Sequence, residues 1–201
     1  MLGTRVGIAF RRAVTDAWWE LRGLTMQNRP LPADPLSLLF VCKGNICRSP
    51  FAAALAARLL GQEGDRRLRC SSAGFQASPG NRAPDHAVTA AARHGVTLAS
   101  HRSVRLTGEL VAASDVLVVM EHTHLALLRR DYPACRDRLV LLPLFAPVSK
   151  HRTGYLRHNI PDPYGKPLPA FEECYAHTRA AVQGLVAALV PVHIDRANFI
   201  S

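Results

Sequence analysis

The sequence predicts an α/β fold in which an open parallel sheet is covered by helices on both faces. Short apolar runs rich in β-branched residues alternate with helical patterns along most of the chain, as in strands joined by crossover helices. The length of 201 residues suits one core of ordinary size with some chain left over. Ligands of such sheets bind beyond the carboxyl ends of the strands, so we expect function in the residues that follow each strand.

Four apolar runs bounded by polar turns are predicted as buried strands. They cover residues 37–41, 67–71, 115–120 and 138–145. Between and after them lie segments with apolar residues at helical spacing, two of which end at a glycine. These segments are 51–61, 84–94, 123–130 and 170–190. The proline-rich segment 146–169 is predicted as a long loop, and long loops in compact domains are often functional.

The charge and the cysteines narrow the class of protein. Lys and Arg number 25 against 15 Asp and Glu, so the formal charge is +10 and anionic partners are favoured. The five cysteines are an odd number without the pattern of a disulfide framework, which indicates a reducing compartment and a cytoplasmic protein. No apolar run reaches the roughly 18 residues of a membrane span. The basic charge is diffuse and no nucleic-acid motif is present, so nucleic acid is not an expected partner.

Residues 1–35 are predicted as an N-terminal extension and residues 36–201 as the main domain. The extension has apolar residues at helical spacing near several arginines, followed by the proline-rich linker NRPLPADP. A helix that contacts a membrane surface or a partner is one interpretation. The others are a helix packed on its own domain, a disordered segment, or a true start at Met26.

The first strand leads into the loop VCKGNICRSP, residues 41–50. A strand-to-helix turn whose backbone N–H groups converge on one point binds a tetrahedral dianion. Gly44 and Asn45 are residues that tolerate the backbone conformations such a curl requires. Cys42 lies at its base, where the N–H groups and the helix N-terminus favour the thiolate. We therefore predict Cys42 as a nucleophile.

The rest of the loop supports the same chemistry. Arg48 offers a planar fork that can hold two phosphate oxygens. Ser49 can donate a hydrogen bond to the sulfur of Cys42 and ease its later departure. Pro50 fits the first helical turn. The long loop carries NIPDPYGKP, where flanking prolines present Asp162 as a general acid and then a base. Tyr164 follows it and can line the pocket beside an aromatic leaving group.

These residues resemble the low-molecular-weight protein tyrosine phosphatases. VCKGNICRSP is similar to the family's phosphate loop and DPY to its general-acid loop, and the similarity extends over residues 36–190 through CSSAG, SHRS and DVLVVME. The resemblance implies a flavodoxin-like, four-stranded parallel sheet in the order 2-1-3-4. It also implies hydrolysis through a phosphocysteine, without a metal or other cofactor. The implied partner is a phosphotyrosine-containing protein, such as a bacterial tyrosine kinase.

By position, the resemblance makes Cys42 the nucleophile, Arg48 the phosphate clamp and Ser49 the partner of the thiolate, with Asp162 as the acid. It places Asn45, Ser72 and His101 in a supporting network that pins the strained asparagine. It also matches Cys47 to a second loop cysteine that can form a reversible disulfide with the nucleophile. A small buried packing residue is the other interpretation of Cys47.

The sequence departs from the family at the pocket rim. Gly165 stands where relatives often carry a second aromatic residue, and Phe75 is the one candidate for the other aromatic wall. Lys43 replaces an apolar residue and is either a rim residue that favours acidic sequences or a solvated surface lysine. The histidines His122 and His124 are predicted as surface residues rather than metal ligands, because they lack adjacent-turn spacing.

Three other functions use the same loop. Arsenate reduction needs resolving cysteines after the second strand, and residues 71–134 contain none. Phosphoarginine hydrolysis goes with threonine where this chain has Ile46, whose apolar surface suits an aryl ring. A phosphotyrosine-binding module with a dead site would not need both Cys42 and Asp162. The favoured hypothesis is therefore a protein tyrosine phosphatase.

Overall fold

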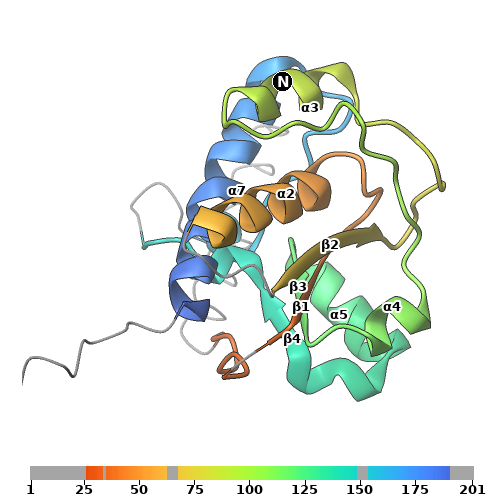
Figure 1. The fold of residues 1–201 in the computed structure, drawn as a ribbon, viewed down its shortest axis with the longest axis vertical. Helices are drawn as coiled ribbons and strands as arrows, with labels where there is room; N and C mark the ends of the chain where they lie inside the picture. The colour runs from red at the N-terminus through yellow and green to blue at the C-terminus, as the bar shows by residue number, and fades with distance from the viewer. Residues whose placement is uncertain (1–25, 34, 63–67, 149–153, 191–201) are drawn as a thin grey trace, which may run out of the picture.

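The computed structural model describes residues 26–33, 35–62, 68–148 and 154–190. Four parallel strands form one sheet in the order β2-β1-β3-β4, as expected (Figure 1). The strands are β1 (Ser37–Cys42), β2 (Arg69–Gly74), β3 (Val116–Val119) and β4 (Leu139–Leu141). The helices are α2 (Arg48–Gln62), α3 (Asp85–Ala92), α4 (Gly108–Ala112), α5 (His122–Asp131), α6 (Tyr155–His158) and α7 (Leu168–Leu189). Two 3-10 helices, η1 (Pro133–Arg138) and η2 (Leu142–Phe145), flank β4.

Helices cover both faces of the sheet, and alternate residues of β1 show why. Leu38 and Phe40 belong to the core under α2, α3 and α7, whereas Leu39 and Val41 belong to the core under α4 and α5. A strand sends successive side chains to opposite faces, so a strand buried on both sides reads as a continuous apolar run. Figure 1 shows α2, α3 and α7 on one face of the sheet and α4 and α5 on the other. The predicted fold class is confirmed.

The fourth strand is shorter than predicted. Residues 138–145 read as one strand, but β4 ends at Leu141 and η2 takes the remaining apolar residues. Pro143 lies within η2, and proline has no N–H with which to continue a sheet ladder. The predicted loop 146–169 also contains the single-turn helix α6.

Part of the predicted linker lies against the domain. The side-chain amide of Asn28 donates to the Leu141 carbonyl at 3.0 Å and accepts from the Leu141 N–H at 2.7 Å, so it pairs with the outer edge of β4. Leu31 packs against the core beside α7. The helix predicted within residues 1–25 lies outside the described residues. The division of the chain at residue 35 stays a prediction.

Candidate active site

The loop between β1 and α2 curls around the sulfur of Cys42. Cys42 is the last residue of β1, and Arg48 is the first of α2. The Asn45 N–H donates to Cys42 Sγ at 3.3 Å, and Ser49 Oγ lies 3.0 Å from the same sulfur. Both contacts bring a hydrogen-bonding group to the sulfur. The N-terminus of the 15-residue helix α2 directs its positive end toward this loop.

Asn45 holds the curl in a conformation that most residues avoid. Its φ is 54°, in the left-handed region, and among the described residues no other non-glycine has a positive φ. The amide Nδ2 donates to Ser49 Oγ at 2.9 Å and to Ser72 Oγ at 2.8 Å. His101 Nε2 lies 2.7 Å from the Asn45 carbonyl oxygen, and it must donate because a carbonyl only accepts. The residues predicted to surround this asparagine therefore do contact it.

Two further contacts support the loop, and neither was predicted. The backbone N–H of Val104 donates to Asn45 Oδ1 at 2.8 Å. From α7, the hydroxyl of Tyr175 donates to the Cys47 carbonyl at 3.1 Å, and its ring stacks on Phe51 with centroids 3.9 Å apart. Tyr175 is fully buried. Its place in an apolar stripe of α7 predicted core packing but gave no sign of this hydrogen bond.

Arg48 connects the loop to the predicted acid. Its side chain is buried, with 1% of the residue exposed. Nη2 donates to Asp162 Oδ2 at 2.6 Å, and Nη1 donates to the Ile160 carbonyl at 3.1 Å and to Glu121. Nε is buried without a hydrogen-bond partner in the described structure. One edge of the guanidinium therefore has a donor free for a further oxygen atom.

The buried guanidinium keeps its charge because acidic groups surround it. Burial acts to lower the pKa of Arg48, but the anionic neighbours outweigh burial and raise this pKa above its ordinary value. Those neighbours are Cys42, Asp162 and Glu121. Arg48 is therefore permanently charged and lies between a cysteine and two carboxylates. An anion that enters the site can replace one of these carboxylates as the partner of the guanidinium.

Glu121 is a site residue that sequence reasoning missed. It follows β3 and precedes α5, and it forms a buried ion pair with Arg48. Its position beyond a strand end was the available signal, because ligand sites of parallel sheets lie there. The predicted surface position of His124 is wrong: it is 5% exposed, packs against the ring of Phe75 and lies 3.9 Å from Glu121. Burial lowers the pKa of His124 to about 4, so its ring is neutral at pH 7.

A cavity of about 240 Å³ opens above the loop. The predicted residues that line it are Cys42, Lys43, Gly44, Ile46, Cys47, Arg48, Asp162 and Tyr164. Asn45 and Ser49 are not part of the lining. Gln76, Ser78 and Asn81, here called the polar wall, also line the cavity and were not predicted. Phe75 is not a wall, because its ring turns toward His124 and the core under α5.

The polar wall is held in place by the backbone. The N–H of Gln76 donates to the Lys43 carbonyl at 2.8 Å, which joins the wall to the loop. At the other end, Ser103 Oγ donates to the Ser78 carbonyl at 2.5 Å and accepts from the Asn81 N–H at 3.0 Å. Tyr164, 63% exposed, is the aromatic residue of the lining. The cavity therefore offers an aryl surface as well as amide and hydroxyl groups.

The second loop cysteine differs from the first in its surroundings. Cys47 is 3% exposed, and burial together with the nearby Asp162 raises the pKa of its thiol well above the ordinary value. Cys47 is thus held as a neutral thiol, whereas Cys42 receives the hydrogen bonds described above. Its predicted disulfide with Cys42 stays a prediction.

The part of the chain that the structure describes has neither a metal-binding cluster nor a membrane-spanning helix. No three His, Cys, Asp or Glu residues there are grouped so that they could hold a metal ion. No described helix is both long enough and apolar enough to cross a membrane.

Known proteins are similar to this chain in both sequence and fold. The chain is 35% identical over 153 residues to the probable low molecular weight protein-tyrosine-phosphatase AmsI of Erwinia amylovora, a match that covers 76% of this chain and 96% of that protein. It is 32% identical over 154 residues to the protein-arginine-phosphatase of Bacillus subtilis (strain 168), covering 77% and 94%. The crystal structure of the tyrosine phosphatase Wzb from Escherichia coli K30 with sulphate superposes with a TM-score of 0.68 at 31% identity, covering 78% and 99%.

The match to a family model is equally extensive. Residues 37–192 match the model of the low molecular weight phosphotyrosine protein phosphatases. The match starts at the first residue of β1 and takes in the loop, the polar wall, the acid and α7. The chain therefore belongs to the low molecular weight phosphotyrosine protein phosphatase family, whose members are hydrolases.

Proposed function

We propose that this protein is a cytoplasmic protein tyrosine phosphatase that hydrolyses aryl phosphate monoesters through a phosphocysteine on Cys42. The observation that carries the proposal is the environment of Arg48, whose buried fork joins the loop around Cys42 to the carboxylate of Asp162. Both groups line one cavity with Tyr164. A nucleophile, an anion clamp and an acid in one small cavity are the parts that phosphoryl transfer requires.

Substrate binding is proposed as an exchange of anions on Arg48. A phosphate in the loop accepts hydrogen bonds from the backbone N–H groups, from the free Nε and from Nη2. Asp162 then loses its hydrogen bond from Arg48 Nη2, which is 2.6 Å long in the structure. Glu121 and the Ile160 carbonyl keep Nη1 in place throughout. Released from Arg48, the Asp162 carboxyl group is free to face the leaving oxygen.

The reaction then has two steps. In the first, Cys42 Sγ attacks phosphorus as the bond between phosphorus and the phenolic oxygen breaks, and Asp162 gives its proton to that oxygen. In the second, Asp162 takes a proton from water as the water oxygen attacks phosphorus, and the Sγ–phosphorus bond breaks. Ser49 Oγ, 3.0 Å from Sγ, stabilises the departing thiolate. Inorganic phosphate leaves, and the enzyme is restored.

The substrate is proposed to be phosphotyrosine in a protein, such as a bacterial tyrosine kinase. Ile46 and Tyr164 give the cavity apolar and aromatic surface for a phenyl ring. Phosphoarginine is the second candidate, because the polar wall of Gln76, Ser78 and Asn81 offers oxygen acceptors to a guanidinium. A relative named as a protein-arginine-phosphatase keeps this candidate open.

The test is hydrolysis of p-nitrophenyl phosphate, a phosphotyrosine peptide and a phosphoarginine peptide by the wild type and three variants. We expect Cys42→Ser to lose roughly 10³-fold or more of the activity, because the nucleophile is gone. Asp162→Asn should slow the phosphotyrosine peptide by about 10²-fold or more. Cys70→Ser, at a half-buried cysteine of β2, is the matched control and should keep wild-type rates.

The outcomes separate the candidates. If the wild type hydrolyses the phosphotyrosine peptide faster than the phosphoarginine peptide, the proposal is supported. The reverse order selects the second candidate. Full activity in Cys42→Ser would disprove the phosphocysteine route for both.

A further inference from the structure

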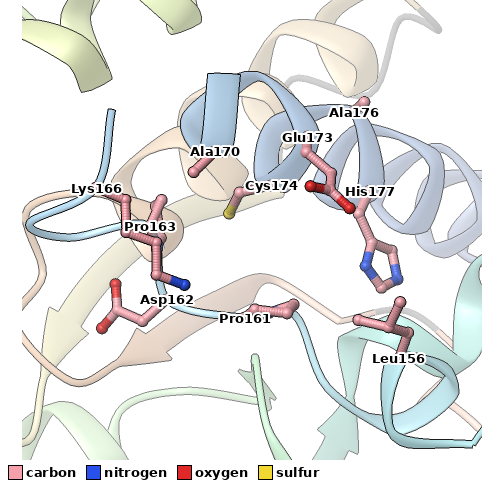
Figure 2. Close-up of a pocket in the computed structure, with 10 residues that line it drawn as sticks. All are labelled: Leu156, Pro161, Asp162, Pro163, Lys166, Ala170, Glu173, Cys174, Ala176 and His177. Atoms are coloured by element: carbon pink, nitrogen blue, oxygen red, sulfur yellow. The ribbon is translucent and has the colours of Figure 1, made fainter. Parts of the chain in front are cut away.

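A second cavity lies behind the acid loop. It has a volume of about 390 Å³ and is formed by α6, the segment 161–166 and the first half of α7 (Figure 2). Pro161 and Pro163 form its wall on the side of the acid loop, and Asp162 lines this cavity as well as the catalytic one. Its volume falls within the range of small-molecule sites. The acid therefore stands between two cavities, and only one of them takes part in the proposed reaction.

The walls of the second cavity are apolar, with charged groups at two opposite sides. Leu156, Ala170 and the two prolines supply the apolar surface. Figure 2 shows Lys166 on the side of the acid loop, and Glu173 beside His177 on the opposite side. The carboxylate of Asp162 turns away from the cavity and bonds to Arg48. A ligand here meets apolar walls and, near Asp162, a cation.

The exposed side chain of Lys166 supplies positive charge on the side of the acid loop. Among the described residues, no carboxylate forms an ion pair with the Lys166 ammonium. The 22-residue helix α7 begins two residues later, at Leu168. Its first turn contains no acidic residue, and no side chain caps its N-terminus. A helix N-terminus favours anions, so the lysine and the helix act in the same direction.

The second cavity is mechanically connected to the acid. The Ile160 N–H donates to the Met120 carbonyl at 2.9 Å, which ties the start of the loop to the end of β3. The Lys166 N–H donates to the Pro163 carbonyl at 3.0 Å, which closes a turn directly after Asp162. A molecule pressed against Pro161 and Pro163 therefore acts on the position of the Asp162 carboxylate relative to Arg48.

We propose that this second cavity is a regulatory site for a small organic anion with a flat apolar body, of the aryl carboxylate class. The carboxylate binds between Lys166 and the start of α7, and the ring packs against the prolines and Leu156. Occupancy changes the position of Asp162 and so changes the step that depends on its proton. That effect on rate rests on the proposed function, whereas the binding itself does not depend on which phosphate ester the enzyme hydrolyses.

Binding is tested first, with benzoate as the probe and inorganic phosphate filling the catalytic loop. Amide chemical shifts are followed by NMR as benzoate is added to the wild type. For about nine heavy atoms we expect a Kd on the order of 1–10 mM, with shifts concentrated in residues 161–173. Lys166→Ala should weaken binding by roughly 3- to 5-fold, and Ala170→Trp should abolish it by filling the cavity. Lys43→Ala, on the rim of the catalytic cavity, should leave it unchanged.

Kinetics then test the link to Asp162. With benzoate bound, kcat/KM, which reports the first step alone, should change at least about twofold for phenyl phosphate, whose leaving group needs a proton. The kcat/KM for 2,4-dinitrophenyl phosphate should stay the same, because its leaving group needs none. In Lys166→Ala the change for phenyl phosphate should need roughly 3- to 5-fold more benzoate. Shifts confined to the catalytic loop, weaker binding in Lys43→Ala, or purely competitive inhibition would overturn the proposal. Because the NMR titration needs no turnover, such a result would leave the proposed phosphatase activity untouched.

Discussion

Gly74 is the position where a single methyl group should damage the site most selectively. It ends β2 and pairs with Cys42 in the sheet, directly beside the backbone of the loop between β1 and α2. A Cβ built on Gly74 would lie 2.8 Å from the Asn45 nitrogen, 2.8 Å from the Lys43 oxygen and 2.9 Å from the Gly44 carbonyl carbon. All three atoms are backbone, so no side chain can swing away to make room. We therefore expect Gly74→Ala to displace the loop itself.

The size of the effect follows from those distances. Ordinary contact of a Cβ begins near 3.4 Å, so the loop must retreat by roughly 0.5 Å. A misplacement of about 1 Å can reduce a rate about 10²-fold, so half of that predicts about a tenfold loss of kcat/KM. Overpacking should also lower stability by about 1–3 kcal/mol. The assay is steady-state hydrolysis of p-nitrophenyl phosphate, with urea unfolding measured on the same preparation.

Two other glycines separate loss of activity from loss of stability. Gly61 lies in α2 with nothing within 4 Å of its added Cβ, so Gly61→Ala should keep the activity and gain about 0.5–1 kcal/mol. Gly184 lies in α7, and its added Cβ would meet the carbonyl oxygen of Phe145. Gly184→Ala should therefore destabilise the fold and leave kcat of the folded protein unchanged. Wild-type kcat/KM in Gly74→Ala would refute the reasoning, whatever its stability.

Four further substitutions test other contacts of the site. Glu121→Gln removes the charge that holds Nη1 of the arginine, and we expect about a tenfold lower kcat/KM for an aryl phosphate. Tyr175→Phe removes one of two donors to the Cys47 carbonyl, which keeps the Phe51 N–H, so the free energy of unfolding should fall by about 0.5–1.5 kcal/mol in urea titrations. Asn45→Ala puts an alanine at φ 54°, so phosphate affinity measured by competitive inhibition should fall. The pKa of His124 is lowered to about 4 in the folded protein. As the pH falls from 7 to 5, the unfolded chain therefore binds a proton at this residue before the folded protein does. Unfolding free energy should therefore drop by roughly 1–2 kcal/mol from pH 7 to pH 5, and less in His124→Gln.

The sequence predicted most of the fold because the sheet is buried on both faces. In a chain of this size, a short continuous apolar run such as that of β1 is typical of a strand covered by helices on both sides. The exception was the segment after Leu141, where the apolar pattern continues but Pro143 ends the ladder. An apolar run identifies burial, and the presence of hydrogen-bonding N–H groups decides whether a buried segment can be a strand.

The site was predictable where its parts are adjacent in the chain. Cys42, Asn45 and Arg48 lie within seven residues, so local geometry alone places them together. Glu121 is 73 positions from Arg48, and a single carboxylate after a strand has no local signature. The direction of Phe75 was equally out of reach, because it depends on contact with the neutral ring of His124 on α5. Contacts across the sheet follow from strand register, which a sequence pattern leaves open.

Asp162 is positioned by Arg48 and by the end of β3. Ile160 accepts a hydrogen bond from Arg48 and donates one to Met120, and Glu121 forms an isolated bridge with Asn159. The segment that leads to Asp162 is therefore built on β3 and α2 and does not hang free from the surface. Such an arrangement makes the two halves of the site interdependent, because a shift of either strand end moves both the clamp and the acid. It also gives the acid loop a defined resting position, which is the condition for any ligand behind it to have a measurable effect.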